Sequence, residues 1–306
     1  MDTKDFEYLV EIARQESLSK AAARLYLSQP TLTKFLKKIE AEYGTPLFDR
    51  VGKKMVLTEA GRCCVQKVCS HLIDTGDGLI VFDSGFQHSI HLMVQAIWEL
   101  GFDPADIKYL IHSHEHFDHI GAANEFKDLY GCKLVISKAG ADIMRDRPEL
   151  VYLKACPNPY ASLFTPDIEL EDGDEITLGN TTIKCLRTPG HSPGVMSFFF
   201  DAVDGDKKYH VGYFGGVGFN TLYKDKLKED GLPLSTREEF LHSLQRVRDI
   251  PVDITLGNHP RQNETLKKRE AMLANPGVNP FIDPTEWQRF ADTLTEEFKA
   301  FMAMGN

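Results

Sequence analysis

The sequence predicts an α/β chain in two parts, a small helical unit followed by a larger unit of mixed strands and helices. Residues 1–62 have the periodicity of helices and end in a hairpin pattern. From His71 onward apolar strands alternate with helices, which is typical of sheets covered by helices. A chain of 306 residues is long enough for one large and one small domain. We therefore expect the first domain to end at residue 62 and the second to occupy residues 63–306.

The composition is that of a soluble globular protein, with 42% hydrophobic and 26% charged residues. No apolar run approaches the ~18 residues that span a bilayer, and the acidic start MDTKDFEYLV is not a signal peptide. The six cysteines form neither a disulfide framework nor a C-x-x-C pair. These features predict a cytoplasmic protein with no membrane partner.

Charge is divided unevenly between the two units. Residues 1–62 hold 11 of the Lys and Arg against 9 of the Asp and Glu, about +2, and the remaining 24 against 36 leave about −12 for the rest of the chain. Such asymmetry indicates different partners for the two units. An acidic second unit is a poor match for a polyanionic substrate such as RNA.

The first unit has the pattern of two helices joined by a tight turn and followed by a basic hairpin. The turn falls around Leu25–Ser28, where Ser28 is the expected N-cap and Pro30 lies in the first turn of the next helix. A helix, turn, helix and hairpin are what a winged helix-turn-helix requires. The second helix would offer its polar side chains to base edges and phosphates, and the hairpin its basic ones to phosphates: Gln29, Thr31, Thr33, Lys34, Arg50, Lys53 and Lys54. Pattern alone leaves open a small helical domain whose lysines are merely solvated.

The segments AAARLYLSQPTLT, LFDR and LTEAG resemble the N-terminal DNA-binding domain of LysR-type transcriptional regulators. That resemblance implies double-stranded DNA as a partner of residues 1–62. The family continues into a long linker helix that pairs two subunits and then into an effector-binding domain. This chain has neither, so the resemblance does not extend to dimeric operator binding, and the oligomeric state stays open.

The second unit carries a dense metal-binding motif in HEHFDH, directly after the apolar strand IKYLI. His114 and His116 lie two apart and can address one metal ion, while Asp118 and His119 open a helix and can address a second. His191 in TPGHSPG and His259 in LGNHP also follow apolar strands, as ligands of one site at a sheet edge would. His112 belongs to the strand itself and is expected to face the core. The remaining histidines are expected to be structural or exposed: His71, His88, His91, His210 and His242.

These motifs stand at the intervals of the metallo-β-lactamase superfamily, which the second unit resembles. The resemblance implies an αββα sandwich with two zinc ions at one edge of its sheets. It assigns His114, His116 and His191 to the first zinc, and Asp118, His119 and His259 to the second. The bridging aspartate of some family members has no counterpart in YHVGYFGGVGFNTLYK, Tyr209 to Lys224, which matches the β-lactamase subclass with an Asp-His-His second site.

The resemblance implies a zinc-dependent hydrolase in which hydroxide attacks an amide, lactam or ester carbonyl. Asp118 would help to orient the nucleophile, and Tyr213, Asn220 and Thr221 would lie in a loop that touches substrate, with ordinary loop packing as the alternative. Nothing identifies the small-molecule substrate, because one fold supports many hydrolyses. The alternative function is a DNA-binding transcription regulator whose sandwich senses a ligand or metal, and a third is a fusion in which one half or both have lost activity.

The ends of the second unit give two further expectations. Members of the superfamily have strands before VCSHLIDTGDGLIVFDSG, so we expect the first sheet to lack its opening strands. Near the C-terminus, Ser235 and Glu238 predict a capping box, and the apolar face of the last helix is expected to cover the sandwich with Trp287, Phe290, Leu294 and Phe298.

Overall fold

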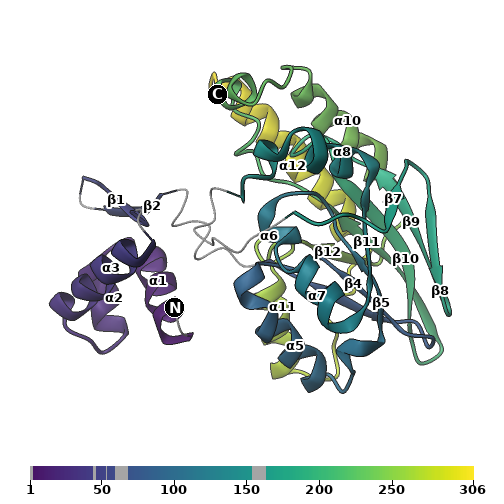
Figure 1. Ribbon diagram of the computed structural model, residues 1–306, viewed down its shortest axis with the longest axis horizontal. Coiled ribbons are helices and arrows are strands. Elements are labelled where there is room, and N and C mark those ends of the chain that lie inside the picture. The colour runs from purple at the N-terminus through teal and green to yellow at the C-terminus, as the bar shows by residue number, and fades with distance from the viewer. Residues whose placement is uncertain (1–2, 44–45, 53, 59–67, 154–162) are drawn as a thin grey trace. The chain divides into compact units, whose positions relative to one another are not determined.

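The computed structural model describes residues 3–43, 46–52, 54–58, 68–153 and 163–306. It separates into two compact units, the first containing the elements from α1 to β2 and the second those from β3 to α12 (Figure 1). The expected boundary at residue 62 falls among residues 59–67, outside the described residues, and stays a prediction. In the described part of the chain, no helix is both long enough and apolar enough to traverse a lipid bilayer.

The first unit is a helical cluster with a two-stranded wing. Its elements are α1 (Thr3–Gln15), α2 (Leu18–Arg24), α3 (Gln29–Tyr43), β1 (Phe48–Val51) and β2 (Lys54–Leu57). Apolar residues of all three helices and of the wing form one buried core, with Leu9, Ile12, Leu32 and Ile39 fully buried. The Glu40 carboxylate of α3 accepts hydrogen bonds from the backbone N–H groups of Leu47 and Phe48, at 2.8 and 3.2 Å, so the wing is fixed to the third helix.

The turn between α2 and α3 forms as expected, and it contains a strained residue. The Ser28 hydroxyl accepts a hydrogen bond from the Thr31 N–H at 3.3 Å, which confirms the N-cap. Tyr26 has φ +56°, and the residue is 95% exposed. A side chain with a Cβ is disfavoured in this left-handed conformation, where glycine or asparagine is preferred.

The second unit contains two five-stranded sheets packed face to face. The first has the order β3-β4-β5-β6-β7, in which β3 is antiparallel and the others are parallel. Its strands are β3 (His71–Asp74), β4 (Leu79–Phe82), β5 (Ile107–Ile111), β6 (Lys133–Ser137) and β7 (Ile168–Leu170). The second has the order β12-β11-β10-β9-β8, in which β11 and β12 are parallel and the other pairs antiparallel. Its strands are β8 (Glu175–Leu178), β9 (Thr181–Arg187), β10 (Met196–Asp204), β11 (Lys207–Phe214) and β12 (Ile254–Gly257).

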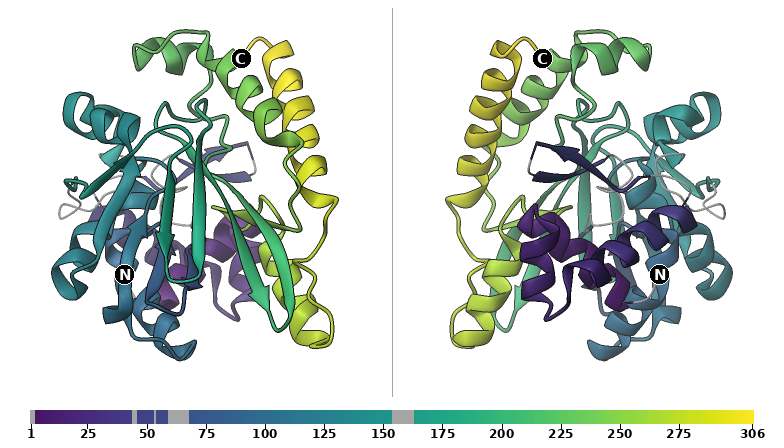
Figure 2. Two further views of the ribbon diagram at one scale, coloured as in Figure 1. Left: turned by 90° about the vertical axis from the view of Figure 1, so that its right-hand side faces the viewer. Right: turned by 90° about the vertical axis from the view of Figure 1, so that its left-hand side faces the viewer.

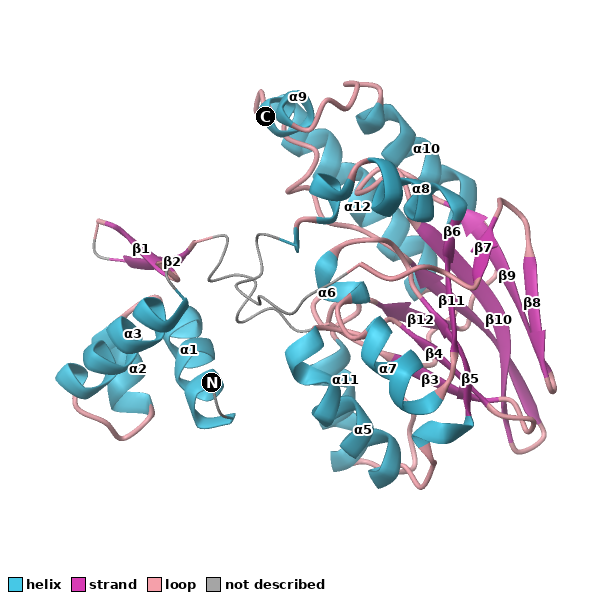
Figure 3. Cartoon of the chain, viewed as in Figure 1, coloured by secondary structure: helices cyan, strands magenta, loops and turns pink. Residues whose placement is uncertain are grey.

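Helices cover the outer faces of both sheets, which confirms the αββα sandwich. Figure 2 shows α12 along one side of the second unit and α5, α7 and α8 on the opposite side, with the strands between them, and Figure 3 distinguishes the helices from the strands by colour. The helices are α5 (Ile90–Glu99), α6 (Phe117–Ile120), α7 (Ala123–Tyr130), α8 (Lys138–Asp146), α9 (Lys224–Glu229), α10 (Thr236–Arg248), α11 (Thr265–Ala274) and α12 (Glu286–Ala303). Short 3-10 turns occupy Gln87–Ser89, Pro104–Asp106 and Pro148–Val151.

Two apolar cores hold these layers together. The inner faces of the two sheets meet in one cluster that includes Phe82, Ile111, Phe198 and Tyr213. The outer face of the second sheet packs against α10 and α12 in another cluster, with Trp287 and Phe298 buried and Phe290 and Leu294 partly buried, as expected. The capping-box prediction is wrong: Ser235 has helical backbone angles, φ −61° and ψ −17°, and its side chain makes no capping hydrogen bond. An N-cap side chain reaches the first-turn N–H groups from a non-helical conformation.

The chain enters the sandwich beside the strand that precedes His259. The Cys69 N–H donates to the Asn258 carbonyl at 2.8 Å, and the His71 imidazole is 3.0 Å from the Gly257 carbonyl. Among the described residues, β3 is the first strand of its sheet, and β1 and β2 pair with each other. Whether the first sheet lacks strands that other superfamily members have can be judged only against those proteins, so this expectation stays a prediction. The cysteines that the structure describes, Cys69, Cys132 and Cys185, are free thiols.

The strain at Tyr26 gives a first testable prediction. Replacing Tyr26 by Gly should stabilise the first unit by about 1 kcal/mol, because the left-handed conformation then costs nothing sterically. Hydrogen exchange of the amides in α1 to α3, measured in the full chain, reports the free energy of unfolding of this unit. Tyr26→Ala, which keeps the Cβ, is the matched control and should give no gain; equal effects of Gly and Ala would contradict the strain.

Candidate metal centre

The strand directions bring distant residues to one edge of the sandwich. In the first sheet β4, β5 and β6 run parallel, and in the second β9, β11 and β12 share one direction because β10 is antiparallel to its neighbours. The residues that follow β4, β5, β9, β11 and β12 therefore gather at the carboxyl ends of these strands. Polar or ionisable side chains directly follow β4, β5, β9 and β12, and a glycine-rich segment follows β11, whereas apolar residues fill the layer between the sheets.

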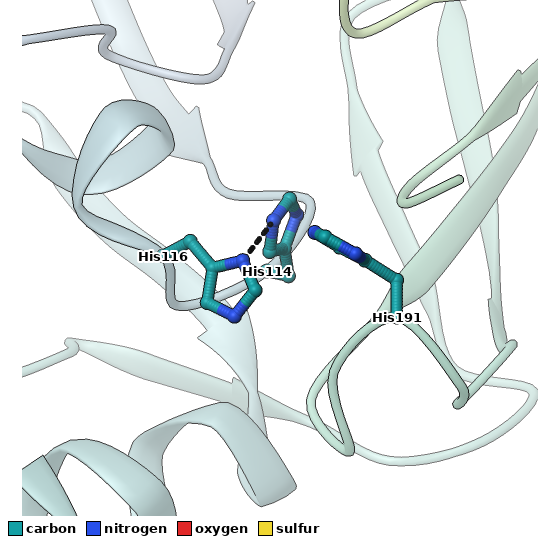
Figure 4. Close-up of side chains that lie close together, drawn as sticks. All are labelled: His114, His116 and His191. Carbon is teal, nitrogen blue, oxygen red and sulfur yellow. Dashed lines mark hydrogen bonds between the residues drawn. The ribbon is translucent and has the colours of Figure 1, made fainter. Parts of the chain in front are cut away.

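Two groups of ligand-type side chains meet at this edge. His114, His116 and His191 form the first group, and Asp118, His119 and His259 form the second, with the potential ligand atoms of each group within 4.8 Å of one another. Figure 4 shows the three imidazoles of the first group converging from two loops. The rings of His114 and His119 have centroids 4.1 Å apart, so the two groups are immediate neighbours. The structure thus brings together all six residues that the sequence selected as metal ligands.

The first group is buried and electrically neutral. The His114 Nε2 and His116 Nδ1 atoms are 3.1 Å apart, and the His191 ring lies edge-on to both, with centroids at 5.0 and 4.7 Å. Burial lowers the pKa of His114 and His116 well below the usual value, and the neighbouring imidazoles lower it further. Burial also lowers the pKa of His191 to about 4. Three neutral imidazoles are the form in which histidine binds a metal ion.

The second group contains a carboxylate and is less enclosed. The Asp118 Oδ2 atom lies 3.6 Å from His119 Nε2 and 3.7 Å from His259 Nε2. The side chain of His259 keeps 22% of its exposure, which opens this end of the site to solvent. Burial disfavours the charged form of His119, but the Asp118 and Asp83 carboxylates outweigh it and raise the pKa.

Asp83, which belongs to neither ligand group, orients His119 of the second group. It follows β4, is fully buried, and lies 2.8 Å from His119 Nδ1. It also accepts hydrogen bonds from the Ser113 N–H at 2.7 Å, from the Ser113 hydroxyl at 2.9 Å, and from the Tyr213 hydroxyl. Burial acts to raise the pKa of Asp83, and the His119 charge and these hydrogen bonds lower it below the usual value. Asp83 is not among the residues predicted from the sequence, although an acidic residue directly after the wholly apolar strand β4 is a usable signal.

The donor set fits a metal ion. With Nδ1 of His119 directed to Asp83, the Nε2 atom faces the second group, is buried, and has no hydrogen-bond partner among the described residues. In the same way His191 directs Nδ1 to the Gly218 carbonyl at 2.8 Å and leaves Nε2 for a ligand. Buried imidazoles whose second nitrogen is held by a carboxylate or a carbonyl are typical of zinc ligands. A buried nitrogen without a partner is costly unless a ligand satisfies it.

The three expected substrate contacts lie in different environments. Tyr213 does not lie in a loop, which corrects that expectation: it belongs to β11, is fully buried, and packs on Phe82 while it donates to Asp83. Thr221 is buried, and its hydroxyl donates to the His191 carbonyl at 2.6 Å. Asn220 is exposed, next to the Thr221 that supports His191. Of the three, Asn220 is the exposed residue, and its contact with a substrate stays a prediction.

Four of the other histidines lie in the core or on the surface, as expected, although His112 directly follows β5 and is not part of it. His112 is buried in the core beside the Val135 carbonyl at 3.1 Å, and burial lowers its pKa to about 4. His71 packs edge-on against Tyr213 at a centroid distance of 5.2 Å. His210 is paired with Asp201 on an exposed hairpin, and His242 is exposed on α10.

The expected DNA contacts of the first unit lie mostly on its surface. Gln29, Thr31 and Lys34 are exposed near the start of α3, and Arg50 is exposed in the wing. Thr33 is half-buried, and its hydroxyl donates to the Gln29 carbonyl at 2.9 Å, so it is turned toward the helix backbone. Lys54 is exposed and forms an ion pair with Glu16 at 2.5 Å. Lys53 lies outside the described residues.

Family comparisons agree with both halves of this description. Residues 67–204 match the model of the metallo-beta-lactamase superfamily, and residues 3–62 match that of the bacterial regulatory helix-turn-helix proteins of the lysR family. The chain therefore joins a lysR-family helix-turn-helix domain to a domain of the metallo-β-lactamase superfamily, and both resemblances seen in the sequence are confirmed.

Individual relatives fall into the same two groups. An uncharacterized HTH-type transcriptional regulator of Bacillus subtilis is 33% identical over 39% of this chain, which spans 37% of that regulator. An N-acyl homoserine lactonase of Bacillus cereus is 27% identical over 65% of this chain and 88% of its own length. Among solved structures, the native metallo-beta-lactamase of Legionella gormanii has a TM-score of 0.69 at 27% identity, covering 77% of this chain and 89% of that one. A subclass B3 metallo-beta-lactamase of Bradyrhizobium japonicum has a TM-score of 0.66 at 28% identity, covering 78% and 88%.

The position of Asp83 gives a second prediction. Asp83→Asn should lower the free energy of unfolding of the second unit by about 3 kcal/mol, since an amide cannot accept all the donors that meet there and hydrogen bonds to a charged group contribute about 1.5–3 kcal/mol each. Urea unfolding followed by tryptophan fluorescence measures this unit alone, because the two tryptophans, Trp98 and Trp287, both belong to it. Tyr213→Phe removes one donor and should cost less; an Asp83→Asn variant as stable as Tyr213→Phe would contradict the role of Asp83.

Proposed function

We propose that the second unit is a zinc-dependent hydrolase of small molecules with an amide, lactam or ester carbonyl, joined to a DNA-binding domain. The observation that carries the proposal is the convergence of six ligand-type side chains from three strand ends into two adjacent groups. His114, His116 and His191 would hold one zinc ion. Asp118, His119 and His259 would hold the second. A di-zinc metallo-beta-lactamase from an Alaskan soil metagenome is among the similar solved structures, with a TM-score of 0.64 at 27% identity, and it supports this count.

Two zinc ions bound there would supply a nucleophile at neutral pH and a Lewis acid for the carbonyl oxygen. The residues of the chain prepare the site for that chemistry. Asp83 and Gly218 each hold the Nδ1 atom of a ligand imidazole, of His119 and His191 respectively, so the Nε2 atoms are directed inward before any ligand binds. Asp118 would take part in the second group, where its carboxylate lies 3.7 Å from His259, and would help to orient the attacking species.

The proposed substrate class is supported by similarity to the relatives named above. The relatives include N-acyl homoserine lactonases and metallo-beta-lactamases, so lactones and lactams are the first candidates. Asn220 is exposed and the side chain of His259 is 22% exposed, so both would be accessible to such a molecule. A polyanionic substrate is disfavoured by the acidic balance of the second unit.

Zinc content and hydrolysis test this proposal together. The full chain should contain close to two zinc ions and should hydrolyse at least one member of a panel of chromogenic cephalosporins, lactones and esters. His116→Ala should reduce the zinc content to about one and abolish turnover, whereas His242→Ala, an exposed histidine of α10, should change neither. A wild-type chain that takes up no zinc under any loading condition would refute the proposal.

A second candidate function, transcription regulation, is favoured by the exposed polar residues at the start of α3. Gln29, Thr31 and Lys34 are available on the helix that a winged helix-turn-helix inserts into the major groove. In this function the second unit would sense a ligand or metal ion, and double-stranded DNA would be the partner of the first.

Gel-shift titrations against genomic fragments test DNA binding. Lys34→Ala should weaken binding and reduce the salt slope by about 1, because one phosphate contact is lost, and Thr31→Ala should weaken binding to the preferred sequence. Lys228→Ala removes the same charge from α9 of the second unit and should have no effect. Binding that is equally sensitive to Lys34 and Lys228 would show that only overall charge is involved.

A further inference from the structure

A buried carboxylate inside the metal motif has no place in either ligand group. Glu115 lies between His114 and His116 and has no exposed surface. Its Oε1 atom accepts a hydrogen bond from the hydroxyl of Ser192, a side chain 77 positions away in the sequence. Its Oε2 atom has no hydrogen-bond partner among the described residues. A carboxylate is seldom buried unless an interaction of its charged or neutral form compensates for lost hydration.

The hydrogen bond between Ser192 and Glu115 joins two different loops of the site. Ser192 directly follows His191 in the loop between β9 and β10, whereas Glu115 belongs to the loop between β5 and α6. These are the two loops that supply the first ligand group. The bond therefore joins the backbone that carries His114 and His116 to the backbone that carries His191.

Further hydrogen bonds fix the Ser192 loop from its other side. The Ser192 hydroxyl accepts from the Gly194 N–H at 3.1 Å, and the Gly194 carbonyl accepts from the Ser137 hydroxyl at 2.6 Å. Ser137 also caps α8 by accepting from the Gly140 N–H at 3.0 Å. Glu115 and Ser192 thus lie at one end of a continuous set of bonds that ends on a helix of the sandwich.

The fit around the Glu115 carboxylate leaves no spare room. A Cβ atom built on Gly194 would lie 2.1 Å from the Glu115 Oε2 atom and 2.7 Å from the Gly140 Cα atom. Both distances are far below a van der Waals contact, so only glycine allows the loop to approach this closely. The carboxylate occupies the space that the absent side chain leaves.

The ring of His191 is oriented within its own loop by other contacts. Its Nδ1 atom is held by the Gly218 carbonyl, and its backbone carbonyl by the Thr221 hydroxyl. Neither contact relates His191 to His114 or His116. We propose that Glu115 and Ser192 are a positioning pair that sets His191 at the correct separation from His114 and His116, so that the first ligand group is formed before metal binds. This inference rests on the proposed metal-binding function.

Zinc affinity measured for one ligand group at a time tests the pair. In the full chain with His259→Ala only the first group keeps all its ligands, and with His191→Ala only the second does. Competition with a chromogenic chelator then gives the dissociation constant of each group. In the His259→Ala chain, Glu115→Ala and Ser192→Ala should each weaken zinc binding by about 10- to 100-fold, as the loss of residues that orient metal ligands does.

Three comparisons separate positioning from a general loss of structure. The Glu115→Ala/Ser192→Ala double variant should bind no more weakly than the weaker single variant, because both remove one interaction. Glu115→Gln keeps an acceptor oxygen and should retain most of the affinity. Ser243→Ala, which removes a buried hydroxyl that bonds the Pro189 carbonyl of the same loop at 2.7 Å, should have no effect.

The outcomes that overturn the inference are distinct from those that overturn the function. A Ser192→Ala variant with unchanged affinity, or equal losses in the His259→Ala and His191→Ala chains, would refute the positioning role while leaving zinc binding intact. A wild-type chain that takes up no zinc under any loading condition would refute the proposed function itself. If Glu115→Ala does not fold, as judged by tryptophan fluorescence, Ser192→Ala and Glu115→Gln decide the matter.

Discussion

The buried carboxylate of Asp83 is the interaction on which the site depends. It stands at the end of β4 in the first sheet and receives hydrogen bonds from the β5 loop through Ser113 and from β11 of the second sheet through Tyr213. Because Tyr213 reaches it across the sandwich, the edges of the two sheets are fixed relative to each other at the point where the ligand loops emerge. The same carboxylate holds His119 by its Nδ1 atom. The Asp83 carboxylate therefore holds the two sheets together at this edge and also orients a candidate ligand. The hydrogen-bond donors around it offset the cost of burying its charge.

A division of labour follows from this arrangement. The strands deliver the ligand loops to one edge, since the carboxyl ends of codirectional strands must meet there. Residues outside the ligand groups then orient two of the imidazoles, Asp83 for His119 and Gly218 for His191. By our proposal the pair of Glu115 and Ser192 sets the spacing between the loops. The apolar cores supply the rigidity on which these short hydrogen bonds depend, because a packed interior does not deform continuously.

The sequence predicted the parts of the site whose signal is local. HEHFDH places four side chains within six positions, and His191 and His259 each follow an apolar strand, so their types and positions were readable without a structure. The residues that support them were not, because each acts on a partner far away in the chain. Asp83 meets Ser113 at a separation of 30 residues, Glu115 meets Ser192 at 77, and Tyr213 meets Asp83 at 130. Tyr213 was assigned to a loop because the glycines that follow it hide the end of β11. The capping box failed because residue types alone do not determine the backbone angles of Ser235.

The central claim is that two preformed ligand groups of different composition lie side by side, three imidazoles in one and a carboxylate with two imidazoles in the other. Zinc X-ray absorption spectroscopy of the full chain in the His259→Ala and His191→Ala forms tests this most directly. We expect a zinc ion with three imidazole nitrogens at about 2.0 Å in the first form, and two imidazoles with a carboxylate oxygen in the second. The same ligand shell in both forms, or sulfur in either shell, would contradict the account.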